Sequence, residues 1–292
     1  MLKFRLPAAI VSLAILTAAC GGAAASPTAS GAPNPTPPPS GVDNPTGAGN
    51  VILRLEEGGG FVPIEFVASQ APLFTLYGDG RVVFQQKSDV FPEADANGVT
   101  RYRPWRIAQL DAGQIEELVT FALAQGGLGA ARKEYGAGMI ADAPTTTFTI
   151  DGGGVTKTVA VSALGMETQE DVAARRAFVV LADRLRDFDG GGTIASDVYV
   201  PTNYRAVLIE REGGVGPAAA PWPWPDLTLA DFAPDVNDAG AFQFPHRTMS
   251  TDEVAGLALG DVSGGIQGLV LDGPDGKEYT FVLRPLLPDE TK

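Results

Sequence analysis

The chain has almost no residues for thiol or imidazole chemistry. Its 292 residues include one cysteine, Cys20, and one histidine, His246. A chain with one cysteine cannot form an internal disulfide, so an exported fold must be stabilised by its core. A Ser-His-Asp arrangement would have to use His246, and a zinc site usually needs several cysteine or histidine ligands. We therefore expect His246 to be a loop residue bonded to the backbone or to water, and we expect no zinc site.

Positive charge is also scarce. The sequence contains 21 Lys and Arg residues against 35 Asp and Glu, which gives a formal net charge of −14 at pH 7. The basic residues form no run. Affinity for nucleic acid and adhesion to anionic lipid both depend on clustered positive charge. The composition therefore argues against nucleic acid as a partner.

A hydrophobic run long enough to span a bilayer, about 20 apolar residues, is lacking as well. The apolar run at the N-terminus covers residues 8–16 and is interrupted by Ser12. Lys3 and Arg5 precede this run, and two alanines follow at positions 18 and 19. A positive segment, a short apolar segment and small residues, in that order, are typical of an export signal. We expect residues 1–19 to be such a signal peptide.

The run Leu16-Thr17-Ala18-Ala19-Cys20 resembles the lipobox of bacterial lipoproteins. The resemblance covers residues 1–20, and Thr17 stands where the family usually has leucine. It implies that a diacylglycerol is attached to the Cys20 thiol and that a peptidase cleaves just before this residue. The protein would then be held at the cell membrane by lipid, on its extracytoplasmic face. The alternative is an ordinary signal peptide cleaved near Ala19, which would leave Cys20 as an incidental thiol.

Residues 21–50 change sharply in composition, to Ala, Ser, Thr, Gly, Pro and Asn. The stretch has no apolar periodicity, so it cannot bury enough surface to offset the entropy lost on ordering. Its proline-rich part, residues 33–39, favours extended polyproline II, and the Gly and Ser parts favour flexible coil. We expect residues 20–50 to be the lipidated cysteine followed by a disordered tether. A polyproline ligand for a partner domain is the alternative.

Strand patterns dominate the start of the remaining chain. Residues 51–55 and 61–68 are predicted as strands, the second at an edge because of Pro63. Hairpins are predicted over 74–84, around Gly-Asp-Gly, and over 145–161, around a triple glycine. Two helices are predicted, one capped by Asp111 and one over 168–188, where apolar residues fall at helical spacing.

The same kinds of element recur further along. Strands are predicted over 197–200 and 204–209, followed by a short helix capped at Ser250 and a hairpin over 268–283. The fold class is therefore α+β, with two small lobes, 51–192 and 193–292, each an antiparallel sheet packed with one or two helices. The shared order of strand, helix and hairpin is compatible with a diverged internal repeat and equally with chance.

Part of the first lobe resembles small uncharacterised bacterial envelope domains. The residues that carry this resemblance are the run 74–82, the helix start at Asp111, and the run 142–148. The resemblance covers about residues 51–190. Those domains have no assigned activity, so the resemblance implies nothing about function.

Trp222 and Trp224 are the candidate ligand-binding residues. Both lie in the run Pro221-Trp222-Pro223-Trp224-Pro225, whose prolines hold the backbone extended. Exposed tryptophans on a stiff loop suit the recognition of a peptide or a glycan. The other interpretation, which we favour, is that both rings pack on the second sheet and cover its edge.

Carboxylates offer no recognisable motif. The run Asp187-Phe188-Asp189-Gly190 begins like a calcium loop, but Val198 stands where a bidentate glutamate is required. The run 235–240 fails similarly, and Asp-Gly pairs usually form turns. We therefore assign no catalytic, cofactor-binding or metal-ligating residue and expect no cofactor.

The sequence indicates the function of the protein only as a broad class. We expect a membrane-anchored extracytoplasmic lipoprotein that acts as a non-enzymatic binding module, whose partner is an envelope protein, a peptide or a glycan. The alternative is a hydrolase that uses paired carboxylates. A purely structural surface protein is a third hypothesis. An aromatic patch at Trp222 and Trp224 would favour the binding module, and acids converging in a deep cleft would favour the hydrolase.

Overall fold

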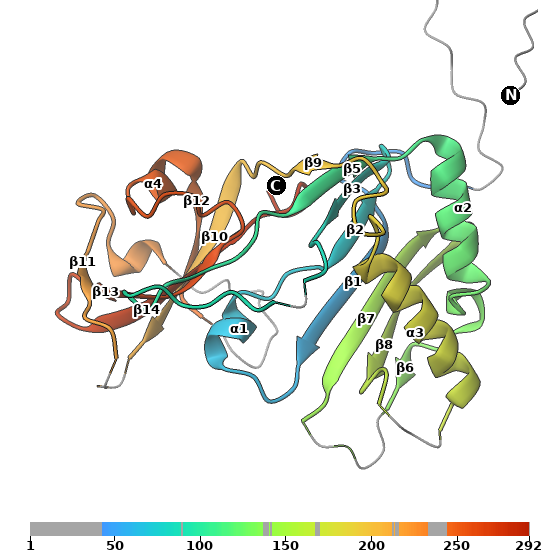
Figure 1. Ribbon diagram of the computed structural model, residues 1–292, viewed down its shortest axis with the longest axis horizontal. Helices are drawn as coiled ribbons and strands as arrows, with labels where there is room; N and C mark the ends of the chain where they lie inside the picture. Colours follow the sequence, from blue (N-terminus) through green and yellow to red (C-terminus); the bar gives the residue numbers. More distant parts are fainter. Residues whose placement is uncertain are drawn as a thin grey trace, which may run out of the picture. The chain divides into compact units, whose positions relative to one another are not determined.

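We analysed a computed structural model of the chain, which describes residues 43–88, 90–136, 140, 142–166, 170–211, 213, 216–232 and 244–291. Within these ranges the chain forms two sheets and four α-helices, and no helix there is long and apolar enough to cross a membrane. Cys20 and residues 235–240 lie outside the described residues, as do residues 1–42. The α+β class with antiparallel sheets in two lobes is confirmed (Figure 1).

The first sheet has eight strands in the order β6-β8-β7-β1-β2-β3-β5-β9. Every pairing in it is antiparallel except that of β6 with β8. The strands are β1 (Val51–Gly59), β2 (Phe74–Tyr77), β3 (Arg81–Phe84), β5 (Arg106–Gln109), β6 (Glu134–Tyr135), β7 (Pro144–Gly152), β8 (Val155–Ser162) and β9 (Asp197–Val198). The two predicted hairpins of this lobe, β2–β3 and β7–β8, are confirmed.

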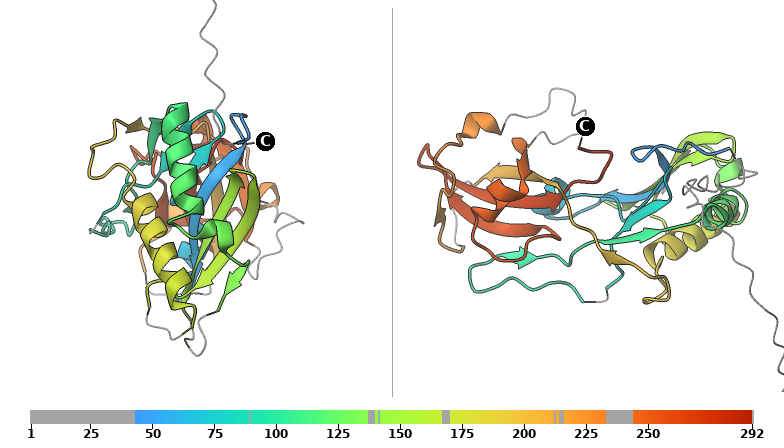
Figure 2. Two further views of the ribbon diagram at one scale, coloured as in Figure 1. Left: turned by 90° about the vertical axis from the view of Figure 1, so that its right-hand side faces the viewer. Right: turned by 90° about the horizontal axis from the view of Figure 1, so that it is seen from above.

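Two helices cover one face of this sheet, α2 (Ala112–Leu123) and α3 (Val172–Arg186) (Figure 2). Asp111 caps α2 as predicted, because its carboxylate accepts from the Gln114 backbone N–H and the Gln114 side chain bonds back. Alternate residues of β1, among them Leu53 and Leu55, point into the core beneath these helices. A short 3₁₀ helix, η1 (Leu128–Ala130), follows α2.

The second sheet has the order β11-β13-β14-β10-β12, with β4 added on β13. Its strands are β4 (Thr100–Arg101), β10 (Asn203–Glu210), β11 (Ala220–Pro221), β12 (His246–Ser250), β13 (Ile266–Asp272) and β14 (Glu278–Pro285). The helix α4 (Thr251–Ala255) and the 3₁₀ helix η2 (Leu229–Asp231) pack with it. Ser250 and Glu253 form the predicted capping box at the start of α4.

The prediction of a strand over 61–68 is wrong. The chain forms the short helix α1 (Ile64–Ala68) here, with Pro63 at its N-cap. The glycines at 59 and 60 have φ values of 73° and 82°, so the chain turns at the end of β1 and leaves the sheet direction. The apolar residues that resembled a strand are largely exposed, whereas Ala68 packs on Val207 and Val282 of the second sheet.

Among the described residues the chain crosses between the sheets three times, from β3 to β4, from β4 back to β5, and from β9 to β10. β4 comes from the first part of the sequence but pairs with β13, and β9 follows the glycines at 190–192 but pairs with β5. The predicted strand at 197–200 therefore completes the first sheet, although it lies beyond the boundary proposed at 192. Residues 43–50 also belong to the folded part, because Gly153 N–H donates to Asp43 O and to Asn44 Oδ1. The folded part therefore begins before Val51.

Candidate functional site

The two candidate tryptophans pack in the second lobe. Trp224 is 6 % exposed, and its Nε1 donates to Glu253 O at 2.7 Å. Trp222 is half-buried, and its Nε1 donates to Leu227 O at 3.0 Å. The ring centroids lie 5.2 Å apart in an edge-to-face arrangement, over the core that includes Phe281. Both tryptophans therefore pack on the second sheet, which is the interpretation favoured from the sequence, and Trp222 is the more accessible of the two.

The other residues singled out from the sequence have structural partners. His246 Nδ1 lies 3.0 Å from Phe244 O, so this histidine bonds to the backbone as expected. Asp189 is 2 % exposed, and its carbonyl oxygen accepts from the backbone N–H groups of a tight turn at residues 192–194. Within the described ranges, no group of three or more His, Cys, Asp or Glu residues could hold a metal ion.

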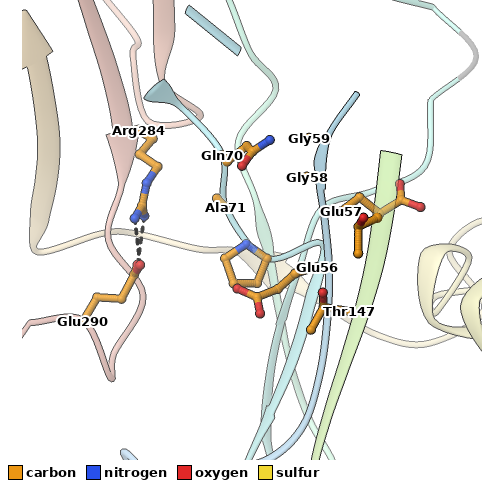
Figure 3. Close-up of a pocket in the computed structure, with 11 residues that line it drawn as sticks. Glu56, Glu57, Gly58, Gly59, Gln70, Ala71, Thr147, Arg284 and Glu290 are labelled. Carbon is orange, nitrogen blue, oxygen red and sulfur yellow. Dashed lines mark hydrogen bonds and ion pairs between the residues drawn. The ribbon is translucent and has the colours of Figure 1, made fainter. Parts of the chain in front are cut away.

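The strongest candidate site is a pocket of about 510 Å³ beside the end of β1 (Figure 3). One wall is β1 itself, through residues 56–59, and another is the segment 70–72 that leads into β2. Thr145 and Thr147 of β7 contribute hydroxyls, and Arg284 and Glu290 come from the end of the chain. Its volume lies in the range of ordinary ligand sites, about 300–1,000 Å³.

Local backbone geometry opens this pocket. β2 pairs with β1 only as far as Leu55, whose carbonyl oxygen accepts from Leu73 N–H at 2.9 Å. β1 then continues to Gly59 beside β7 alone. Gly58 lets the Gln70 carboxamide lie against the strand, because a Cβ at this position would stand 2.9 Å from Gln70 Oε1. The gap between β1 and the segment 70–72 forms part of the pocket.

Glu290 is fully engaged by hydrogen bonds. Arg284 donates to both of its carboxylate oxygens, at 2.7 and 2.9 Å, and Leu287 N–H donates to Oε2 at 2.9 Å. Burial opposes ionisation of Glu290, but the Arg284 guanidinium outweighs it, so the pKa of Glu290 lies below its ordinary value. This ion pair forms the charged wall of the pocket that Figure 3 shows with dashed lines.

Glu56 is the free carboxylate of the pocket. In the part of the chain that the structure describes, its side chain has no hydrogen bond or ion pair, and it is half-buried. Its neighbour on the same strand face, Arg54, is bound to Asp289 at 2.8 Å. Burial raises the pKa of Glu56, and the nearby charges of Glu290 and Asp289 raise it further, against the opposing effect of Arg54.

Glu57 lines the same pocket but is bound elsewhere. It extends from the opposite side of β1 (Figure 3) and accepts from Arg186 and from Thr146 Oγ1. Gln70 is exposed, and its carboxamide has no hydrogen-bond partner among the described residues. The pocket therefore offers one free carboxylate and one free carboxamide beside an ion pair, a set suited to a polar ligand with positive charge.

Sequence reasoning missed all of these residues. Glu56, Gln70, Arg284 and Glu290 are far apart in the chain and belong to no motif. The one local indication is the run Glu56-Glu57-Gly58-Gly59-Gly60, two acids before a triple glycine that ends a strand. That run predicts a turn and gives no reason to expect Arg284 beside it.

A second, smaller pocket of about 350 Å³ lies between α2, α3 and residues 187–194. Its rim carries the Arg184–Glu117 ion pair, at 2.8 Å, and its interior includes Leu118 and Phe188 of the first core. Arg186 binds Asp183 of this rim at 3.3 Å, and Asp187 is exposed to solvent. The first pocket, where the free carboxylate is half-buried, therefore remains the stronger candidate.

Comparison with known proteins gives no further guidance. A scan against protein-family models and searches of curated proteins and of solved structures found no match to this chain. The resemblance of residues 51–190 to envelope domains therefore stays an expectation.

Proposed function

We propose that the protein is a lipoprotein anchored through Cys20 at the extracytoplasmic face of the cell membrane, and that its folded part binds a ligand in the pocket at Glu56. The anchor rests on the sequence alone. A positive segment, a short apolar run and small residues precede the single cysteine of the chain. One acyl chain holds a protein only marginally, whereas two or more give stable attachment.

The anchor is tested by Cys20→Ser in cells supplied with a fatty-acid analogue. Wild-type protein should remain in the membrane fraction and take up label, because the lipid is attached to the thiol. The Cys20→Ser variant should lose the label and appear in the medium or the periplasm. Unchanged membrane retention of the variant would refute the anchor.

One observation supports the binding module most strongly, the unpartnered Glu56 carboxylate in a pocket of ligand size. A half-buried charge without a partner carries a desolvation cost that a bound ligand would offset. Glu290 and Glu57 cannot fill this role, because arginines already occupy them. Among the described residues, Glu56 is therefore the lining carboxylate that is left for a ligand.

Binding is tested by a thermal-shift screen of the full chain against cell-wall glycan fragments, small amines and peptides. A ligand of the native state raises the melting temperature. At least one class should raise it for wild type and for Glu116→Gln, a matched change on α2, but not for Glu56→Gln. No shift with any class, or an equal shift in Glu56→Gln, would contradict the assignment.

A carboxylate hydrolase is the second candidate, and one observation favours it. Glu56 and Glu290 line one pocket, and their pKa values are shifted in opposite directions, as expected of a general acid and its ionised partner. The three hydrogen bonds to Glu290 count against it, because they occupy the oxygens that would attack or activate water. Turnover of nitrophenyl glycosides that is lost in both Glu56→Gln and Glu290→Gln would establish the hydrolase instead.

A further inference from the structure

The edge of β1 beside the pocket is free to pair with another strand. The Leu55 carbonyl group bonds toward β2, and main-chain groups along a strand alternate between its two sides. The main-chain groups of Glu57 and the N–H of Gly59, which precedes the turn, therefore face the same side as those of Leu55, and β2 does not extend this far along β1. Among the described residues neither has a main-chain partner on that side. A free strand edge is a template for an added strand.

The segment opposite this edge does not satisfy it. Pro72 has no N–H to donate, and its carbonyl oxygen accepts instead from Gln85 Nε2 at 3.2 Å. Ala71 lines the pocket without a polar side chain, and among the described residues no hydrogen bond joins its main chain to β1. The pocket of about 510 Å³ is thus lined by the stretch of β1 that has no partner strand on this side among the described residues.

The charge of the pocket selects a cation. Glu56 has no hydrogen-bond or ion-pair partner in the described part of the chain, and it stands on the same face of β1 as Arg54, which is bound to Asp289. The two other lining carboxylates are already bound to arginines, Glu57 to Arg186 and Glu290 to Arg284, so the remaining negative charge is that of Glu56. A Lys or Arg side chain at this point would gain a charge-assisted hydrogen bond.

An apolar rim joins the two walls of the pocket. Residues 60–69 connect Gly59, in the wall formed by β1, to Gln70, in the wall formed by residues 70–72. Within this connection Phe61 is 93 %, Phe66 43 % and Ile64 39 % exposed. The rim is held in place, because Gln267 Nε2 donates to Glu65 O at 3.3 Å and Ala68 packs on the second sheet. Contiguous exposed apolar residues of this kind mark interaction surfaces.

We propose that the pocket binds an extended polypeptide segment in which a Lys or Arg is flanked by apolar residues. This proposal rests on the proposed binding function and names its ligand class. The segment pairs with the free edge of β1 through Glu57 and Gly59, its basic side chain meets Glu56, and its apolar neighbours cover Phe61 and Phe66. Such strand addition takes affinity from main-chain hydrogen bonds and specificity from alternate side chains.

The first test is selection from a random twelve-residue peptide library displayed on phage, with the full chain in detergent as the target. Enriched peptides should contain Lys or Arg beside apolar residues. They should bind about tenfold less tightly to Glu56→Gln, because a hydrogen bond to a charged group is lost, and equally well to Glu116→Gln. No enrichment, a consensus without basic residues, or full affinity for Glu56→Gln would overturn the proposal.

The second test addresses the strand pairing. In the complex, the amide hydrogens of Glu57 and Gly59 should exchange more slowly, and N-methylation of the peptide at alternate residues should weaken binding by about tenfold. If these amides stay unprotected while the peptide binds, strand addition is refuted. A Glu56-dependent response to a glycan or to a free amine, with no enriched peptide, would refute this ligand class while the proposed binding function stands.

The third test concerns the rim. Phe61→Ser changes a side chain that is 93 % exposed, so it should fold normally and bind a selected peptide several-fold more weakly. For comparison, binding of wild type and of Phe61→Ser to vesicles of phosphatidylcholine and phosphatidylglycerol is measured. If Phe61→Ser abolishes vesicle binding but leaves peptide affinity unchanged, the rim is a membrane contact and the proposal is wrong at this point.

Discussion

Glu56 and Glu290 are two carboxylates in one pocket with opposite surroundings. Arg284 and a backbone N–H stabilise the ionised form of Glu290, whereas Glu56 is desolvated beside negative neighbours and has no partner among the described residues. Burial alone therefore does not determine the direction in which the pKa of each carboxylate is shifted. The position of a single guanidinium makes one residue structural and leaves the other available to a ligand.

Glu56→Gln should change how stability depends on pH. The folded-state pKa of Glu56 is raised, so the folded protein holds its proton more tightly than the unfolded chain does. Stability is therefore lost as pH rises through the window between the two pKa values. The variant should match wild type below the unfolded pKa and exceed it at pH 7 in urea unfolding. A less stable variant at pH 7 would contradict the environment assigned to Glu56.

Glu290→Gln should act in the opposite direction. The lowered pKa of Glu290 means that its ionised form stabilises the fold above the unfolded pKa, and this contribution disappears as pH falls through the folded pKa. At pH 7 the variant should lose about 2 kcal/mol of unfolding free energy, because Arg284 is left buried without its counter-ion. Urea unfolding at pH 7 and pH 3 measures this, with exposed Glu93→Gln as the control.

At the scale of single residues, local features were predictable and the site was not. Asp111 and Ser250 were identified as caps because a cap depends on residues three positions away. Glu56 depends on Arg284 and Glu290, more than two hundred residues away. No pattern in one sequence contains that proximity.

At the scale of elements, the hairpins and the two long helices agree with the sequence because their periodicity and turns are local. The prediction of a strand over residues 61–68 was wrong. The apolar residues of this segment suggested burial in a strand, whereas they form an exposed rim after a glycine turn. The strand at 197–200 was identified, but its partner, β5, was not predictable. Strand pairing depends on tertiary contacts that propensity does not encode.

The described residues after β14, 286–291, form no helix or strand but contribute to the core. Leu287 is 1 % exposed and packs with Tyr77, Trp105 and Tyr199 on the face of the first sheet away from α2 and α3. Leu287→Ala should cost about 2–4 kcal/mol of unfolding free energy, since it removes buried methyl groups and leaves a cavity. Chemical denaturation measures this, and a loss below about 1 kcal/mol would show that the segment packs only loosely.

At the scale of the whole folded part, the two sheets exchange strands. β4 joins the second sheet and β9 the first, so neither sheet is complete without a segment from beyond the boundary at 192. A cluster that contains Trp105, Tyr199 and Leu287 also brings together residues from both predicted lobes. The lobes predicted from the sequence are therefore recognisable as sheets, but we expect them to unfold together.

Cooperative unfolding is testable with the Trp105→Phe variant. The remaining tryptophans, Trp222 and Trp224, then report on the second sheet, while far-ultraviolet circular dichroism reports mainly on α2 and α3. Urea transitions from the two probes should coincide, as in a two-state protein. Two separate midpoints would show that the sheets are independent domains.

The central claim is that this fold is a binding module held at the membrane by lipid on Cys20. The intact mass of the protein extracted from membranes tests it most directly. The account predicts a chain that begins at Cys20 and exceeds its polypeptide mass by a diacylglycerol, with or without a further acyl group. A mature chain that carries Cys20 as a free, unmodified thiol would contradict it.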